Sequence, residues 1–424
     1  MTKSRVYATL LYFIFMFSAI FSINILQLIG AILYVLIICI LDYEESTYLT
    51  VILSPSVAIV SIPWIGVSLL GIGSFILCVR THVFRAIDNN LFFLFSIVFM
   101  ITGSRLIDGN IFDCVLFMLV ILTLLLCQSL LKNENIKNTQ LIYSYRFGCL
   151  LMIIGMIFDY IFIGGTMGRF RAVADDCNYT AAALYVVFII SLISFGYSLR
   201  LMHNTFYLII SLVFGLSTGS RGFMLTVGLA LAFFGIRGLI KRGDRKITFL
   251  SIIGVLALIV MYIFNVSSVV KLYDVTVGRT LSLKNSYSQG NFMDITSGRL
   301  FLWDYYWTNK VTNLREFLFG TGFHNYYLTE NGGYGLAAHN MYISGIIGVG
   351  LIGLLVVIML YLSFFKKKNI GVITNWVFLA IPIGIFIEYI MLDGLFDQRI
   401  IIYMLMASCL AVYINDKENI RQKN

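Results

Sequence analysis

The chain has 424 residues, of which 59% are hydrophobic and 12% are charged. Soluble globular domains carry about twice that share of charged residues, so the composition excludes them and predicts a multi-pass membrane protein. The net charge of +9 does not indicate nucleic acid, because the basic residues lie in short loops between apolar runs.

Apolar runs separated by polar breaks predict an all-α integral membrane protein with about 12 to 14 transmembrane helices, since each span needs about 20 residues. The stretch from residue 48 to 79 contains Pro55 and Pro63 and fits either one broken helix or a tight pair of helices, which leaves the count open. The predicted spans are 6–22, 25–41, 48–62, 64–79, 91–107, 110–130, 141–163, 179–199, 204–220, 222–236, 247–265, 340–364, 372–391 and 400–415.

Basic residues in alternate loops predict the orientation, because cytoplasmic loops are enriched in lysine and arginine. Both termini are therefore expected in the cytoplasm. The chain divides into N-terminal transmembrane helices (1–265), a large helical extracytoplasmic loop (266–338), and C-terminal helices with a cytoplasmic tail (339–424). The loops assigned to the cytoplasm contain Arg80 and Arg85, Lys132 and Lys137, the cluster from Arg237 to Lys246, and Lys366 to Lys368.

The basic residues of the short outer loops are all arginines. Guanidinium suits bidentate capture of phosphate oxygens at a dry boundary, whereas lysine offers a point charge. The alternative is contact with lipid headgroups, and both interpretations stay open for Arg221, while headgroup contact is favoured for Arg105 and Arg399. The outer-loop arginines are Arg105, Arg169, Arg171, Arg221 and Arg399.

The sequence of the large loop predicts an amphipathic helix that begins near Arg299. Trp303, Tyr306 and Trp307 follow at helical spacing and either anchor the helix at the membrane surface, which is favoured, or line a sugar groove. Farther on, Gly320-Thr321-Gly322 predicts a tight passage of the backbone.

His339 stands where the polar loop runs into an apolar helix. We expect it in the first turn of that helix, where unpaired backbone N–H groups keep an imidazole neutral and able to act as a base. A purely capping role is an equal alternative. His324 is a competing base, ranked lower because a polar glycine turn follows it. The two histidines lack acidic or thiolate companions, so no metal site and no cofactor are predicted.

Several short motifs between about residue 160 and 360 resemble, in order, those of the family of O-antigen polymerases and O-antigen ligases. The C-terminal motif is His339-Asn340 followed by Gly350 and Gly353. A cysteine, Cys177, stands where the family often has proline. The other matching elements are Ser220-Arg221-Gly222, Gly298-Arg299 with Trp303, and Arg169, Arg171, Asp176 and Asn178.

The resemblance implies a metal-independent inverting glycosyltransferase of GT-C-like architecture that acts on undecaprenyl-diphosphate-linked glycans at the outer face of the bacterial inner membrane. His339 would deprotonate the acceptor hydroxyl, and Arg221 and Arg299 would clamp the donor diphosphate. The large loop has no Asp-x-Asp sequence, which favours a metal-free reaction. A chain-length regulator is a candidate partner, and nucleic acid is not. The substrate-binding residues would be Arg169, Arg171, Asn178, Trp303 and Asn340.

Three functions compete. A polymerase that joins lipid-linked repeat units is favoured over a ligase that moves the glycan to lipid A core, because the span count leans to 14 and the arginines are spread over several outer loops. A flippase or other transporter would carry ionisable residues at mid-membrane. Here Asp159, Glu388 and Asp393 lie close to helix ends.

Overall fold

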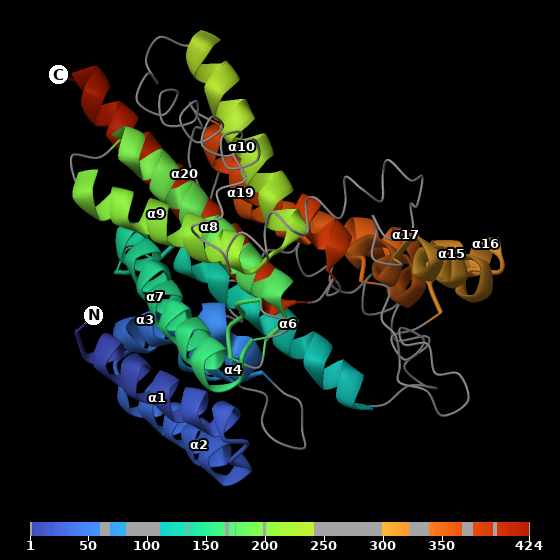
Figure 1. The fold of residues 1–424 in the computed structure, drawn as a ribbon, viewed down its shortest axis with the longest axis horizontal. Helices are drawn as coiled ribbons and strands as arrows, with labels where there is room; N and C mark the ends of the chain where they lie inside the picture. Colours follow the sequence, from blue (N-terminus) through green and yellow to red (C-terminus); the bar gives the residue numbers. More distant parts are fainter. Residues whose placement is uncertain are drawn as a thin grey trace.

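A computed structural model describes residues 2–59, 68–81, 111–133, 135–165, 169–173, 175–197, 201–240, 299–321, 339–366, 376–392 and 397–423. Helices and no β-strands are found in these ranges, so the all-α prediction is confirmed for them (Figure 1). The helices are α1 (Thr2–Ile20), α2 (Asn24–Ile40), α3 (Tyr43–Leu53), η1 (Ser54–Ile59), α4 (Leu69–Thr81), α6 (Ile111–Leu130), α7 (Asn138–Phe162), α8 (Cys177–Tyr197), α9 (Leu201–Ser217), α10 (Arg221–Ile240), α15 (Arg299–Lys310), α16 (Leu314–Phe319), α17 (Met341–Leu362), η7 (Ser363–Phe365), η8 (Trp376–Leu379), α19 (Ala380–Glu388), η9 (Tyr389–Met391) and α20 (Gln398–Lys423).

Four of the described helices are long and apolar enough to cross a membrane by length and composition: α7, α8, α17 with η7, and α20 as far as Lys417. Shorter apolar helices accompany them, within α2, α4, α6, α9, α10 and α19. This set is compatible with a polytopic membrane protein. The predicted spans 91–107 and 247–265 lie outside the described residues, as does most of the large loop.

Helices α3 and α4, from the described residues 43–59 and 68–81, form a tight pair. Arg80, near the end of α4, donates to the carbonyls of Ile38 and Leu41 and to the Ser46 hydroxyl, so the end of α4 lies beside the start of α3. The two helices are therefore antiparallel. The first of them begins five residues earlier than the predicted residue 48, because the Asp42 carboxylate caps it by accepting from the Glu45 N–H at 2.8 Å.

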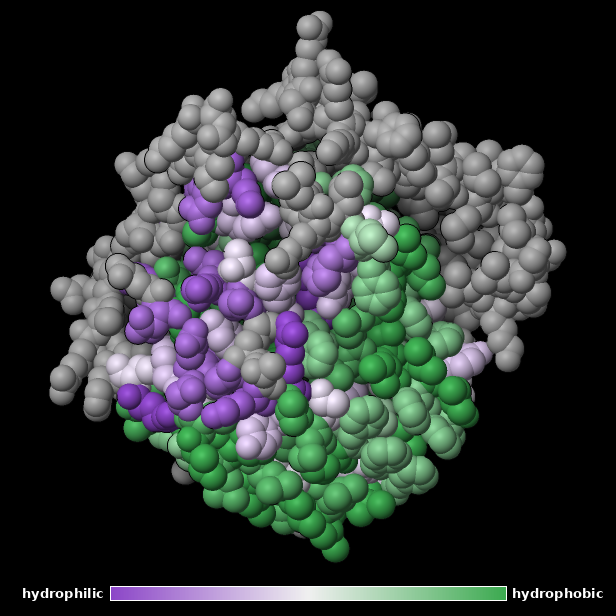
Figure 2. Space-filling view, turned by 90° about the vertical axis from the view of Figure 1, so that its left-hand side faces the viewer, coloured by the Kyte–Doolittle hydropathy of each residue, from purple (hydrophilic) through white to green (hydrophobic). Residues whose placement is uncertain are grey.

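Helix ends gather on two opposite faces of the bundle. One, here called the terminal face, carries the starts of α1, α3, α7 and α9, and both chain ends lie toward this side in Figure 1. Hydrophilic side chains collect there above an apolar flank (Figure 2). The other, here called the opposite face, carries the starts of α8, α10, α17 and α20 and the ends of α7, α9 and α19.

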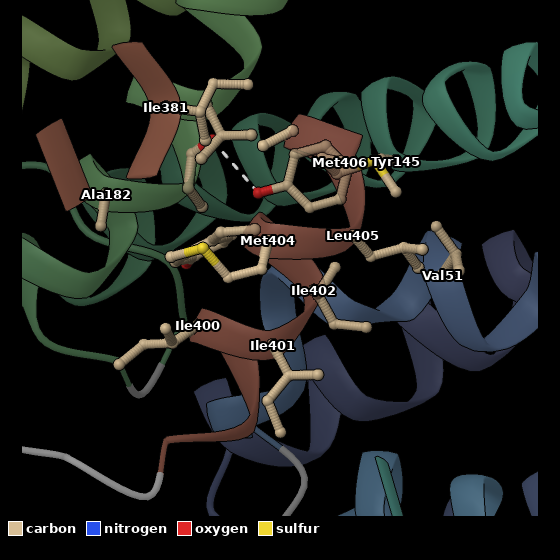
Figure 3. Packing of buried hydrophobic residues seen from close by; sticks show 14 of the residues in the cluster. Val51, Tyr145, Ala182, Ile381, Ile400, Ile401, Ile402, Met404, Leu405 and Met406 are labelled. Carbon is tan, nitrogen blue, oxygen red and sulfur yellow. Dashed lines mark hydrogen bonds between the residues drawn. The ribbon is translucent and has the colours of Figure 1, made fainter. Parts of the chain in front are cut away.

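Helix α20 runs through the centre of the bundle. Its residues from Ile400 to Met406 are all 2% exposed or less, although they point in every direction around the helix. They pack against Val51 of α3, Tyr145 of α7, Ala182 of α8 and Ile381 of α19 (Figure 3). A helix that is apolar on all sides is stable only when it is surrounded, so α20 holds the other helices in place.

A break in α17 receives the loop helix α16. Gly350 adopts φ +74° and ψ 172° inside α17, and Gly320, which follows α16, has φ +76°. A side chain on Gly350 would collide with the carbonyl of Leu318. The Ile347 carbonyl accepts from the Thr321 N–H at 2.6 Å and from its hydroxyl at 3.0 Å. The predicted tight passage at Gly320 is confirmed.

We predict that Gly350→Ala lowers the free energy of unfolding by about 3 kcal/mol or more, because its backbone conformation is nearly restricted to glycine and the added carbon collides with α16. Gly228→Ala is the matched control. Nothing lies within 4 Å of a carbon added to Gly228 in α10, so this change should stabilise by about 0.5–1 kcal/mol. Thermal unfolding of the purified protein measures both, and equal melting temperatures for the two variants would contradict the docking.

Candidate active site

The turn before α10 places Arg221 at the opposite face. Ser220 caps the helix by accepting from the Phe223 N–H at 3.4 Å, and Gly219 supplies a φ of +61°. Arg221 is the first residue of α10 and is half-buried. A helix start has a positive field, so a guanidinium at this position makes a strong attractor for an anion.

Glu388 lies directly beneath this turn. It is the last residue of α19 and is 1% exposed. A carbon added to Gly222 would lie 3.1 Å from the Glu388 Cγ, so the glycine of Ser220-Arg221-Gly222 makes room for this carboxylate. The Ser220 hydroxyl faces it, but neither carboxylate oxygen forms a hydrogen bond of normal geometry in the described part of the chain. The sequence prediction left Glu388 out of the site. An acidic residue at the end of an apolar helix was the available signal.

Arg169 ties a second segment to the same turn. Its Nε donates to the Thr218 carbonyl at 2.6 Å, and its Nη2 lies 3.5 Å from the Asn178 Oδ1. Two residues predicted to bind substrate, Arg169 and Asn178, are thus neighbours at the start of α8 and beside Arg221. Both of these partners are neutral oxygens, so the positive charge of Arg169 is not cancelled by these contacts.

His339 lies just before α17. The helix begins at Met341, with Asn340 as its cap, so the expected first-turn position of His339 is corrected by two residues. His339 is exposed and has a φ of +49°, a conformation that few residues other than glycine adopt. Such strain is most often retained at functional positions. The Asn340 Oδ1 accepts from the N–H groups of Tyr342 and Ile343 at 2.9 and 3.1 Å, which gives Asn340 a capping role.

One hydrogen bond brings the start of α17 to the rest of the site. The Tyr342 hydroxyl donates to the Phe386 carbonyl at 2.9 Å, two residues before Glu388. The end of α19 therefore contacts the helix that follows His339 on one side and the helix that begins at Arg221 on the other. Residues more than a hundred positions apart in sequence converge on this point.

The helix that begins at Arg299 packs on α17. Tyr306 of α15 is fully buried against Ile347, with Ile343 beside it. Arg299 lies about 10 Å along the helix from Tyr306. Trp303 is half-buried and Trp307 is 45% exposed. The Arg299 side chain and all of His324 lie outside the described residues.

Two other outer arginines pair with carboxylates. Arg171 contacts Asp159 at 3.3 Å. Arg399 bridges Asp175 at 3.0 Å and Asp397 at 2.9 Å, and it stacks 4.0 Å from the centre of the Tyr179 ring. Burial raises the pKa of Asp175, and Arg399 opposes that shift. Arg399 thus joins the start of α20 to the loop before α8, while Arg105 lies outside the described residues.

The histidine, cysteine, aspartate and glutamate side chains of the described ranges form no group of three that could hold a metal ion. The guanidinium groups of Arg169 and Arg221 lie at the same turn before α10, and α10 and α17 each contact the end of α19 with their first residues. The starts of both helices carry a positive field. Such a set can bind a diphosphate.

We predict that Arg399→Gln destabilises the fold by about 3 kcal/mol or more, because it leaves the buried Asp175 carboxylate without its ion-pair partner and removes the ion pair with the partly buried Asp397. Arg315→Gln, at an exposed position of α16, should change stability by no more than about 0.5 kcal/mol. Thermal unfolding tests the pair. An Arg399→Gln protein as stable as Arg315→Gln would show that the bridge has no structural role.

Comparison with curated proteins finds no match to this chain. Residues 206–358, just over a third of the chain, match the family model described as O-antigen ligase. This segment contains Arg221, Arg299 and His339. The resemblance to the O-antigen polymerase and ligase family is therefore confirmed by this segment.

Proposed function

We propose that this protein is an O-antigen polymerase, which transfers a growing glycan from undecaprenyl diphosphate to a sugar hydroxyl of another lipid-linked repeat unit. One observation carries the proposal: the helix that begins at Arg221 and the helix that follows His339 each contact the end of α19 with their first residues. The match to the O-antigen ligase model supports this class of activity in general.

In the proposed reaction, the imidazole of His339 takes the proton of the acceptor hydroxyl while that oxygen attacks the anomeric carbon of the donor sugar. The bond between the anomeric carbon and the phosphate oxygen breaks, and undecaprenyl diphosphate leaves with the electron pair. A single displacement inverts the anomeric configuration. Arg221, Arg169 and Arg299 stabilise the charge that develops on the leaving diphosphate, in the place of a metal ion.

The remaining residues bind the substrates in this proposal. Asn178 holds Arg169 toward the turn, and Asn340 fixes the start of α17 by capping it. Trp303 stacks on a sugar ring, and Arg171 receives a second lipid diphosphate near the Asp159 pair. His324 is the alternative base.

We further propose a GT-C-like architecture of 12 to 14 spans in the bacterial inner membrane, with both termini in the cytoplasm. The alternating helix directions support this arrangement. So does the polar terminal face with its apolar flank, which suits a membrane boundary (Figure 2). The opposite face, with the candidate active site, is then periplasmic.

Ligation of the glycan to lipid A core is the second candidate. The arginines favour polymerisation, because Arg169 and Arg221 would bind one lipid diphosphate at the turn before α10, and Arg171, beside Asp159, would bind a second. Deletion of the gene separates the two functions. A polymerase deletion leaves lipopolysaccharide capped with one repeat unit, whereas a ligase deletion leaves core with none, and the second result would overturn the proposal.

We predict that His339→Ala lowers polymerisation by about 10²–10⁴-fold, because it removes the base. Arg221→Gln should lower it by about 10²–10³-fold through loss of charge stabilisation. Assay of purified protein with lipid-linked repeat units measures both. Arg315→Gln removes an exposed arginine of α16 and serves as the control, with activity near that of the unaltered protein. Full activity of His339→Ala would remove His339 from the mechanism.

We predict that Glu388→Gln lowers turnover about tenfold or more while the melting temperature stays equal or rises. An isosteric amide removes the desolvation cost of burying a carboxylate that lacks hydrogen bonds, so folding should not suffer. The same change removes a negative charge next to Arg221 and so alters the electrostatic field at the proposed diphosphate site. Parallel turnover and melting measurements test this. Unchanged turnover would exclude Glu388 from the active site, and a lower melting temperature would assign it a structural role.

A further inference from the structure

A buried arginine lies far from the candidate active site, near the terminal face. Arg146 is in the third turn of α7 and is 2% exposed. Taking a guanidinium out of water is costly unless a negative charge and hydrogen bonds compensate for the lost hydration. The contacts of Arg146 therefore show whether the fold itself supplies that compensation.

The partners of Arg146 are neutral. Its Nη1 donates to the Asn204 Oδ1 at 2.9 Å, and its Nη2 donates to the Ser191 Oγ at 3.1 Å. Its carbon Cζ lies 5.3 Å from the centre of the Tyr207 ring. Its Nε is buried without a hydrogen bond in the described part of the chain, where no carboxylate forms an ion pair with it.

This guanidinium borders a small cavity that is open to solvent and has a volume of about 20 Å³. Polar and apolar atoms contribute equally to the lining of the cavity. Exposed His203, near the start of α9, is one of the lining residues, so the cavity opens on the terminal face. The lining residues with polar groups are Thr139, Tyr143, Arg146, Ser194, His203, Asn204 and Tyr413.

We propose that this cavity binds a phosphate group, with Arg146 as its principal ligand. Phosphate presents several oxygens to planar guanidinium donors, and the hydroxyls of Thr139, Tyr143 and Ser194 suit the remaining oxygens. The bound phosphate supplies the negative charge that the neutral partners of Arg146 do not provide. The phosphate belongs either to a free anion of the aqueous phase or to the headgroup of an anionic phospholipid in the adjacent leaflet. The site is independent of the glycan-transfer site.

Asn204→Asp provides a test that keeps the shape of the cavity. The new carboxylate lies beside the Arg146 Nη1 and acts as an internal counter-ion, so the variant should fold, melt at an equal or higher temperature, and bind phosphate at least about tenfold more weakly. Asn135→Asp adds the same charge at an exposed loop position before α7 and is the control.

The first measurement is thermal unfolding of the full-length protein in detergent, with inorganic phosphate against chloride at equal ionic strength. We expect phosphate to raise the melting temperature of the unaltered protein and of Asn135→Asp by about 2 °C, and to leave Asn204→Asp unchanged. No shift in the unaltered protein would overturn a free-anion site, and an equal shift in Asn204→Asp would place the phosphate elsewhere.

The second measurement is native mass spectrometry after reconstitution with phosphatidylglycerol. Retention of this lipid by the unaltered protein and its loss from Asn204→Asp would identify a headgroup as the source of the phosphate. If neither the unaltered protein nor Asn204→Asp retains the lipid, but phosphate raises the melting temperature of the unaltered protein in the first measurement, the source is a free anion. Absence of both effects in the unaltered protein overturns the proposal.

Discussion

The hydrogen bond from the Tyr342 hydroxyl to the Phe386 carbonyl is the contact on which the candidate active site depends. It fixes the start of α17, and so His339, against the end of α19. Two residues farther on, Glu388 approaches Gly222 so closely that the position suits a residue without a side chain. A single short helix thus brings together the two segments that hold the proposed base and a proposed diphosphate ligand.

The outer arginines separate according to what neutralises them. Arg399 forms ion pairs with buried Asp175 and partly buried Asp397 and joins the start of α20 to the loop before α8, whereas Arg171 pairs with buried Asp159 through its Nε. Arg169 bonds to neutral oxygens beside the start of α10, which leaves its charge available to attract an anion. The same criterion, applied at the terminal face, points to Arg146 and its cavity. A guanidinium without a carboxylate is therefore informative in this protein wherever it is buried.

The all-α class was predictable from apolar periodicity, and the grouping of Arg169 with Asn178 from the family resemblance, because both report on local sequence. The helix pair around Pro55 was one of two alternatives that the sequence left open. Helix starts were less predictable. Because Asp42 caps α3, this helix begins earlier than predicted. Because Asn340 caps α17, that helix begins after His339. The role of Arg399 and the place of Glu388 depend on contacts between distant segments, and a single sequence carries no record of those contacts. The break at Gly350 likewise depends on a distant segment, because α16 docks there.

The central claim is that the starts of α10 and α17 form one diphosphate-binding site at the end of α19. Its most direct test is a cryo-EM structure of the protein with undecaprenyl diphosphate. The account predicts that the diphosphate lies within hydrogen-bond reach of Arg221, with the imidazole of His339 facing the same cavity. A diphosphate bound away from the start of α10, or a His339 that faces a separate compartment, would contradict it.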